Sequence, residues 1–381
     1  MRFERRLLTR DAGAGVLQKL WAIPWSFVLL IGLVAAVGYV ALYSAGGGAA
    51  EPYAGRHALR FAFGLVLMIG VALLHIRIIA RLAWLGYAAG VALLAYVLVA
   101  GQVGGGAQRW IDLGVLQLQP SELMKILLVL ALAAWFHRAS HERVGNPLFL
   151  IPPLIAVLVP VALILRQPNL GTALIVLTLG GIMFFAAGVR LWKFALVAGA
   201  AAIAAPIAYE SLHAYQRARI TTFLDPESDP LGAGYNIIQS KIALGSGGIW
   251  GKGFLQGTQG HLNFLPEKQT DFIFTMWAEE FGFVGALSLL TLLAGVILFG
   301  FLVALRCRHQ FGRLVAIGLA SNFFLYVFVN VAMVTGTIPV GGVPLPLVSH
   351  GGSAMLTVML GFGVLMSVHV HRDADLGAAR D

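Results

Sequence analysis

Charge and cysteine are both scarce in this chain of 381 residues. Only 11% of the residues are charged and 59% are apolar, whereas a soluble domain carries about 25% charged residues. This composition, with a mean hydropathy of +0.85, excludes an ordinary water-soluble protein and predicts one polytopic membrane body. The single cysteine, Cys307, excludes an intramolecular disulfide, and the sequence has no Cys and His cluster with zinc spacing.

Long apolar runs, by contrast, are plentiful. A helix needs about 20 apolar residues to cross a hydrocarbon core of about 30 Å, because its backbone must hydrogen-bond to itself. We therefore predict an all-α polytopic membrane protein with about ten transmembrane helices. The runs lie near Trp25–Ser44, Ala58–Leu74, Ile79–Ala100, Pro120–Phe136, Pro147–Leu165, Leu170–Gly188, Trp192–Tyr209, Phe272–Leu305, Leu314–Val334 and Val348–His369.

Basic residues are distributed unevenly between the loops that join these runs. The short loops on one side carry only Arg56, Arg109 and Arg166, and the other side carries most of the remaining arginines and lysines. The positive-inside rule then places both termini in the cytoplasm, with residues 1–24 as an N-terminal segment, 25–371 as one membrane domain and 372–381 as a tail. Because the cations are scattered in small groups, we expect no nucleic-acid partner.

One connection is much longer than the others. Residues 210–271 join the seventh and eighth runs on the extracytoplasmic side. Loops of this length are usually functional or disordered, and this one contains apolar residues such as Ile237, Trp250 and Phe254 that can pack. We therefore expect a folded extracytoplasmic loop over the helices.

Charged residues at the outer ends of the runs are the best guide to function, because each is costly in lipid. In the first cluster, Glu122 and Lys125 are three residues apart, so on a helix they share a face and can form an ion pair. That pair could serve a site or only fix packing, with Ser121 and Glu122 capping the helix start behind Pro120. The cluster is Arg109-Trp110 followed by Gln119-Pro120-Ser121-Glu122 and Lys125.

The second cluster surrounds the start of the eighth run. On a continuous helix Asp271, Thr275 and Glu279 would form one stripe, which could hold a catalytic base, a metal ion or a transported cation. The alternative role for Asp271 is an N-cap of that helix. A third, glycine-rich segment at residues 245–253 contains Lys252 and could either cradle a diphosphate or form a plain turn.

Five blocks between about residues 108 and 353 resemble the signature of the SEDS family, the shape, elongation, division and sporulation proteins, and most closely its RodA branch. The blocks are Gln108–Gly114 with Gln119–Lys125, Gln167–Ala173, Gly234–Ser240 with Gly245–Gly253, Leu265–Glu280, and Ser349–Ser353. This sequence departs from the family pattern at Asn169, where the family usually has Asp, and at His350, where it usually has Tyr.

The resemblance implies a glycosyltransferase of the bacterial cytoplasmic membrane that polymerises lipid II for cell elongation and releases undecaprenyl diphosphate. It also implies a class B penicillin-binding transpeptidase as partner. Asp271 would be the essential catalytic residue, and Arg109 and Lys125 would be functionally important. Asn169 keeps the hydrogen-bonding reach of Asp but loses its charge.

For this reaction we expect Asp271 to act as general base, with Arg109, Lys125 and Lys252 supplying positive charge to diphosphates. No cofactor is firmly predicted, although a divalent cation (Mg²⁺ or Mn²⁺) could bind at Asp271. The remaining expected substrate-binding residues are Trp110, Gln119, Ser121, Glu122, Asn169, Gln239, Glu267, Glu279, Ser349 and Ser353.

The sequence is also compatible with two other classes of function. A lipid II flippase would move the lipid without forming a bond, with Glu122, Lys125 and Arg60 along the path of the headgroup. A membrane scaffold would only activate a partner through its outer loop. Reconstitution separates the three, because polymer indicates the enzyme, translocation without polymer the flippase, and neither the scaffold.

Overall fold

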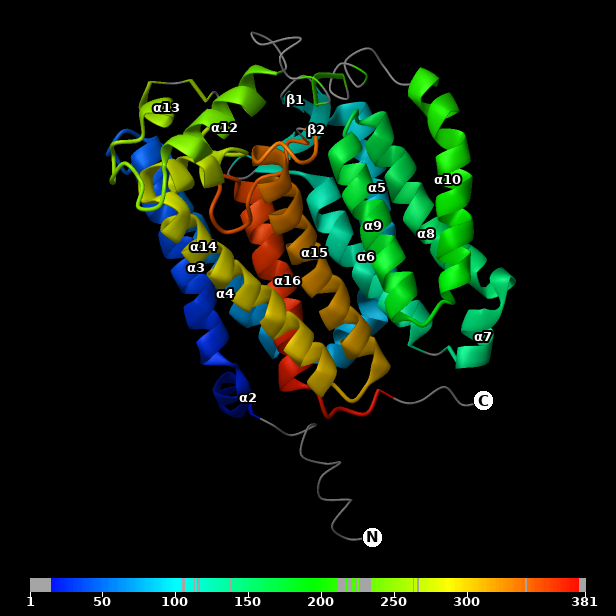
Figure 1. Cartoon of the computed structure of the whole chain (residues 1–381). Helices are drawn as coiled ribbons and strands as arrows, with labels where there is room; N and C mark the ends of the chain where they lie inside the picture. Colours follow the sequence, from blue (N-terminus) through cyan, green and yellow to red (C-terminus); the bar gives the residue numbers. More distant parts are fainter. Residues whose placement is uncertain are drawn as a thin grey trace.

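The apolar runs fold into helices that stand side by side, as the computed structural model in Figure 1 shows. The structure describes residues 15–104, 107–112, 114, 117–137, 139–211, 217, 221–223, 225, 234–262, 264–265, 267–339 and 341–376. Parts of the expected N-terminal segment, C-terminal tail and 210–271 loop lie outside these residues. The helices are α2 (Val16–Ala22), α3 (Trp25–Ala45), α4 (Ala54–Leu73), α5 (Ile76–Ala100), α6 (Pro120–Phe136), α7 (His141–Gly145), α8 (Pro147–Arg166), α9 (Leu170–Ala186), α10 (Leu191–Ser211), α12 (Tyr235–Ser246), α13 (Thr258–His261), α14 (Ile273–Arg306), α15 (Gln310–Val334) and α16 (Gly352–Val370).

Each of the ten predicted runs corresponds to a helix, with ends that differ by a few residues. Among the described residues, seven helices are long and apolar enough to cross a membrane: α3, α4, α5, α8, α14, α15 and α16. α6 and α9 have 17 residues each, and the apolar part of α10, Leu191–Ala204, is shorter still. The chain is therefore a mostly helical multi-pass membrane protein, and the count of ten spans stays a prediction.

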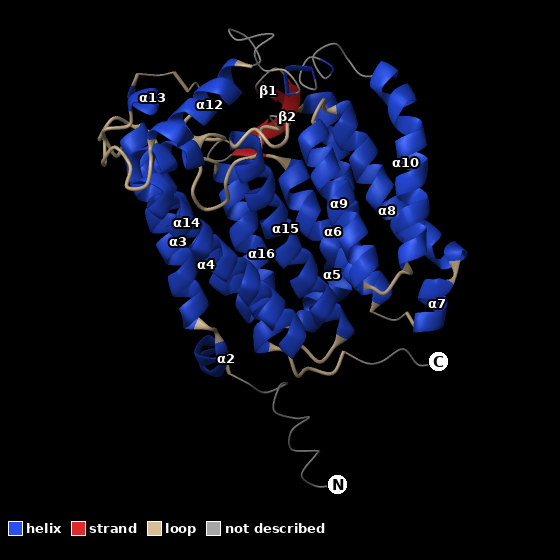
Figure 2. Cartoon of the chain, in the orientation of Figure 1, coloured by secondary structure: helices blue, strands red, loops and turns tan. Residues whose placement is uncertain are grey.

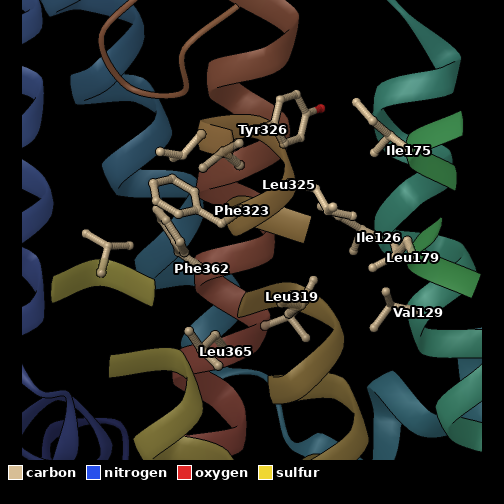
Figure 3. Close-up of a cluster of buried hydrophobic side chains, with 14 of the residues drawn as sticks. Ile126, Val129, Ile175, Leu179, Leu319, Phe323, Leu325, Tyr326, Phe362 and Leu365 are labelled. Carbon is tan, nitrogen blue, oxygen red and sulfur yellow. The ribbon is translucent and has the colours of Figure 1, made fainter. Parts of the chain in front are cut away.

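The centre of the bundle is an apolar core. α16 packs along α4, α5 along α6, and α14 along α3 and α15. Figure 3 shows side chains of α6, α9, α15 and α16 meeting in one buried cluster, and Tyr326 lies at its upper edge with its hydroxyl pointing toward the side of α6 and α9. The other labelled members are Ile126, Val129, Ile175, Leu179, Leu319, Phe323, Leu325, Phe362 and Leu365. The core thus ends, at that edge, on a side chain with a polar group.

The two ends of the bundle differ in what covers them. α12, α13 and three short strands lie at one end, which we call the strand end, and α2 and α7 lie at the other (Figure 1). The last turns of α16 lie at the same end of the bundle as α2. The first described helix and the last turns of the last one therefore lie at the same end of the bundle.

A small sheet at the strand end was not anticipated from the sequence. Its strands are β1 (Gln102–Gly104), β2 (Ala107–Asp112) and β3 (Gln117–Leu118), antiparallel in the order β1-β2-β3. They occupy the connection between α5 and α6 (Figure 2). Because β2 carries Arg109 and Trp110, the sheet brings the first charged cluster over the ends of the helices.

α14 is interrupted near its beginning, where Gly282 adopts a φ of +65°. A glycine-rich loop, residues 247–255, bridges the break, because two of its amides donate to carbonyls before the break and two of its carbonyls accept from amides after it. These bonds run from Lys252 to Glu279, Gly253 to Glu280, Phe283 to Gly248 and Val284 to Ile249, with N···O distances of 2.9 to 3.2 Å. The loop amides at residues 252 and 253 are therefore not available to cradle a diphosphate.

Candidate active site

A cavity of about 340 Å³ opens at the strand end and gathers most of the polar residues that the sequence analysis selected. Its wall is formed by β2, the starts of α6 and α9, the turn before α14, one side of α15 and the loop before α16. The lining residues used below are Arg109, Trp110, Gln119, Glu122, Lys125, Asn169, Glu267, Thr270, Asp271, Tyr326, Gly342 and His350.

Asp271 lies in the turn that precedes α14 and lines this cavity, half-buried. The helix begins at Ile273 with Phe272 as its N-cap, so Asp271 does not cap it. The backbone of the turn is fixed from outside: Asn330 Nδ2 donates to the Asp271 carbonyl at 2.8 Å, and Ser349 Oγ donates to the Thr270 carbonyl at 2.6 Å. Side chains of α15 and of the loop before α16 thus set the position of this carboxylate.

Glu122 and Lys125 form the expected ion pair at the start of α6, with Nζ 2.7 Å from Oε1. Both side chains are nearly excluded from solvent, at 6% and 1% exposure. The Tyr326 hydroxyl donates to Glu122 Oε2 and contacts Lys125 Nζ, which lies 4.1 Å from the centroid of the tyrosine ring. All three side chains line the cavity, so the pair is part of its wall rather than of the packing below.

Arg109 joins the sheet to the start of α9. Its Nε donates to the Gln167 carbonyl at 3.0 Å and one Nη to the Pro168 carbonyl at 2.5 Å. Asn169 follows, and its side chain accepts from the Thr172 amide at 3.3 Å as the N-cap of α9. A neutral Asn serves this cap as well as Asp does, which gives the departure from the family pattern a structural role.

His350 is also part of the cavity wall. Arg60 Nη1 lies 3.2 Å from His350 Nε2, and the ring of Tyr53 meets the imidazole edge to face. Burial, together with the positive charges of Arg60 and Arg56, lowers the pKa of His350 from 6.5 to about 4. The side chain is therefore neutral at pH 7 and can accept a hydrogen bond from Arg60.

Six of the expected residues do not line the cavity, and two of these, Ser349 and Ser353, hydrogen-bond to the backbone of residues beside or on it. Ser349 holds the Asp271 turn, Ser353 Oγ accepts from the Gln119 amide at 3.0 Å, and Ser121 is buried at the start of α6. Gln239 is half-buried on α12.

Lys252 and Glu279, the other two, pair with each other at 2.7 Å beside the break in α14. Thr275 is buried against Ser240. The expected stripe of Asp271, Thr275 and Glu279 is therefore wrong, because Asp271 precedes the helix and Glu279 faces the glycine-rich loop.

Sequence reasoning missed Tyr326, Thr270 and Gly342 as cavity residues. Tyr326 sits in an apolar run and has no charged neighbour in sequence, so nothing in the charge pattern singles it out. One signal was present, since Tyr326 and Asn330 are four residues apart and share a face of α15. Gly342 lies against the catalytic candidate, because a Cβ added there would be 3.7 Å from Asp271 Oδ2.

The chemistry that this wall can perform follows from its charges. A half-buried carboxylate, Asp271, can accept a proton from a hydroxyl group, and an ammonium and a guanidinium on the same cavity can stabilise a developing phosphate charge. Among the described residues, no group of three or more His, Cys, Asp or Glu side chains could hold a metal ion. Asp271 and Glu267 nevertheless line the same cavity.

Comparison with known proteins identifies a matching family and several relatives of this chain. A family model for FtsW, RodA and SpoVE, described as a cell cycle protein, matches residues 18–374. Peptidoglycan glycosyltransferase MrdB of Escherichia coli (strain K12) is 48% identical over 320 residues, which cover 82% of this chain and 84% of that protein. MrdB of Helicobacter pylori is 38% identical over 321 residues, which cover 83% of each chain.

Two solved structures share the fold. A chain from a study of how a peptidoglycan synthase complex coordinates polymerization and crosslinking aligns with a TM-score of 0.81 at 34% identity, covering 93% of this chain and 99% of its own. The rod shape determining protein RodA of Thermus thermophilus aligns with a TM-score of 0.70 at 33% identity, covering 93% of this chain and 98% of its own. Both alignments extend over nearly the whole chain.

Proposed function

The chain belongs to the FtsW, RodA and SpoVE family, and we propose that it is a peptidoglycan glycosyltransferase that polymerises lipid II at the outer face of the cytoplasmic membrane. Curated relatives that are 38% to 48% identical over 320 or 321 aligned residues carry the name peptidoglycan glycosyltransferase. The observation that carries the proposal is the cavity in which Asp271, Lys125 and Arg109 face one space.

In this reaction a sugar hydroxyl of one substrate attacks the anomeric carbon of another. The new glycosidic bond forms as the bond from that carbon to the diphosphate breaks, and the bonding electrons leave with the diphosphate. Asp271 accepts the hydroxyl proton or orients the hydroxyl, which needs a carboxylate within hydrogen-bond reach. Lys125 and Arg109 stabilise the charge on the departing diphosphate.

Asp271 and Glu267 also fit a divalent cation such as Mg²⁺ or Mn²⁺. Magnesium in proteins is usually held by one or two carboxylates together with substrate phosphates, and these two carboxylates line the same cavity. When bound, the cation would neutralise phosphate charge. With the cation bound, Lys125 and Arg109 would still stabilise the departing diphosphate, because each lines the cavity from a different element.

The strand end is the extracytoplasmic end in this proposal, with ten membrane-crossing helices and both termini in the cytoplasm. The position of α2 and of the last turns of α16, both at the opposite end of the bundle, supports it. In a Cys307→Ser background, a membrane-impermeant maleimide should label Gln256→Cys in intact cells and Glu142→Cys on α7 only after permeabilisation. Labelling of both in intact cells would contradict this orientation.

The partner that we propose is a class B penicillin-binding transpeptidase. The support is the structural neighbour from a peptidoglycan synthase complex, whose reported subject is the coordination of polymerization and crosslinking. Such a partner would crosslink the strands that this chain polymerises.

The direct test is polymerisation of fluorescent lipid II by the purified Asp271→Ala variant in vesicles. We expect loss of glycan polymer by about a hundredfold or more, the scale on which essential catalytic groups act. The matched control is Asp373→Ala, which removes an exposed aspartate that pairs with Arg308 at the other end of the bundle. Undiminished polymer from Asp271→Ala would remove this residue from catalysis, and translocation without polymer by the unaltered protein would indicate a flippase.

A further inference from the structure

The glycine-rich loop has a feature that bridging α14 does not explain. Its tip exposes two large apolar side chains, Ile249 at 63% and Trp250 at 78%. Phe283, which bonds to the loop across the helix break, is 63% exposed. Covering one such side chain with an apolar neighbour is worth about 1.5–3 kcal/mol, so three that lie together mark a contact surface.

This surface lies on the flank of the bundle. Phe254 of the loop stacks on Tyr43 of α3, with ring centroids 6.3 Å apart, and lies 6.2 Å from the ring of Phe281. Figure 1 shows α3 and α14 side by side, and the two helices pack together. Val284 and Leu287 continue the exposed apolar surface along α14. The loop tip is therefore continuous with the face that a membrane-spanning helix presents to lipid.

The backbone of the loop is suited to an apolar environment. Non-helical backbone tolerates membrane depth only where its polar groups are hydrogen-bonded within the protein. Here the Gly251 amide donates to Gly247, and the four bonds across the α14 break occupy the amides of residues 252 and 253 and the carbonyls of residues 248 and 249. The strand end therefore offers a loop whose tip needs little water.

The charge of the loop fits the same environment. Between Ile249 and Leu255 the one charged residue is Lys252. Its ammonium lies 2.7 Å from Glu279 and 2.8 Å from the Thr258 hydroxyl, directed back toward the protein. The charge of Lys252 is therefore neutralised by Glu279, and the tip exposes no other charged side chain, whereas a loop in water ordinarily exposes several.

We propose that Ile249, Trp250 and Phe283 insert into the boundary between lipid headgroups and acyl chains at the strand end and anchor the glycine-rich loop in the membrane. Tryptophan favours this boundary because its ring is amphipathic. The anchor holds the first turns of α14, and the Asp271 turn before them, at a fixed depth relative to the lipid surface. This inference goes beyond the proposed function and concerns where the site is held.

Nitroxide accessibility in lipid vesicles tests the anchor. Cys307 is the only cysteine, so a Cys307→Ser background allows one label at Trp250→Cys or Ile249→Cys, both at exposed positions. Oxygen concentrates in lipid and a nickel chelate in water, so we expect the ratio of oxygen to nickel collisions at 250 and 249 to exceed that at Gln256→Cys by about threefold or more. Gln256 is the matched control, an exposed polar residue beyond the loop.

Leu287→Cys, on the lipid-facing surface of α14, supplies the in-membrane reference. Nickel collisions at residues 249 and 250 equal to those at Gln256 would overturn the anchor. Protection that arises only after a purified transpeptidase is added would also overturn it, and would identify the surface as a protein interface. The measurement reads no activity, so its failure is distinguishable from failure of the proposed function.

Discussion

Two lysine–glutamate pairs among the described residues have the same separation and different surroundings. In the first, Lys125 and Glu122 belong to one helix turn, and in the second, Lys252 and Glu279 are brought together from the glycine-rich loop and α14. Both pairs measure 2.7 Å, yet the Lys125 side chain is 1% exposed and that of Lys252 is 25% exposed. The first pair lines the cavity and the second lies beside the break in α14.

This difference shows that placement, rather than the ion pair itself, indicates function. A buried ion pair is weak support for stability, because desolvation can exceed the Coulombic gain. The pair on α6 carries that cost at the cavity wall, where an ammonium can meet a phosphate. The Lys252 pair instead holds the glycine-rich loop against the interrupted backbone of α14, where Lys252 also donates to the Thr258 hydroxyl.

Of the variants considered, Lys125→Gln should cause the largest loss of activity. We expect polymerisation of lipid II to fall by about a hundredfold or more, because the cavity loses its buried cation. Removing one partner of a buried pair also costs about 3–5 kcal/mol of stability, so the variant must be compared with Glu122→Gln/Lys125→Gln, which leaves no unpaired charge. Thermal unfolding and the fluorescent lipid II assay measure the two effects. A folded double variant with ordinary activity would make the pair a packing element.

Tyr326→Phe should have the next largest effect. The hydroxyl of Tyr326 donates to Glu122 and contacts Lys125, so its loss removes a hydrogen bond to a charged group, worth about 1.5–3 kcal/mol. We expect a loss of polymerisation of about tenfold or more. The matched control is Tyr87→Phe, which removes a hydroxyl that donates to the Ala156 carbonyl away from the cavity. Equal losses from both variants would deny Tyr326 a particular role.

Lys252→Gln should leave polymerisation within about threefold of the unaltered protein and lower its stability instead. Glu279 is fully buried, and without the ammonium it keeps only neutral donors, at a cost of about 2 kcal/mol. Lys252→Arg should recover much of that stability. Thermal unfolding in detergent measures the change in stability. A hundredfold loss of activity at unchanged stability would contradict this prediction and give Lys252 a role in the reaction, as proposed for Lys125.

The sequence predicted the helices well and the site in part. The predicted run Pro120–Phe136 matches α6 at both ends, because Pro120 marks the start and the apolar run marks the length. The resemblance supplied Asp271, Arg109 and Lys125, which the structure brings to one cavity. The three residues come together through helix packing and the loop before α16, and local sequence patterns predict neither.

Other features could not be predicted because long-range contacts decide them. The stripe assumed a helix that includes Asp271, but α14 begins only at Ile273, and Glu279 is taken up by Lys252 of the glycine-rich loop. The sheet was missed because its strands are two to six residues long and surrounded by glycine. Tyr326 was missed because apolar neighbours conceal a polar group that only tertiary packing turns toward Glu122.

The smallest effect concerns pH and again separates the cavity from the loop. Because the pKa of His350 falls from 6.5 to about 4 on folding, the unfolded chain binds more protons between those values. Stability should therefore decrease as the pH falls from about 6.5 toward 4 and be insensitive to this residue above pH 7. The contribution between pH 7 and 5 should be about 1 kcal/mol or less, since the ring is only half-buried. His350→Gln should flatten the pH dependence of thermal unfolding by that amount, whereas Lys252→Gln should lower stability without flattening it. Identical profiles for the His350 variant and the unaltered protein would show that the imidazole is not held neutral by Arg60 and burial.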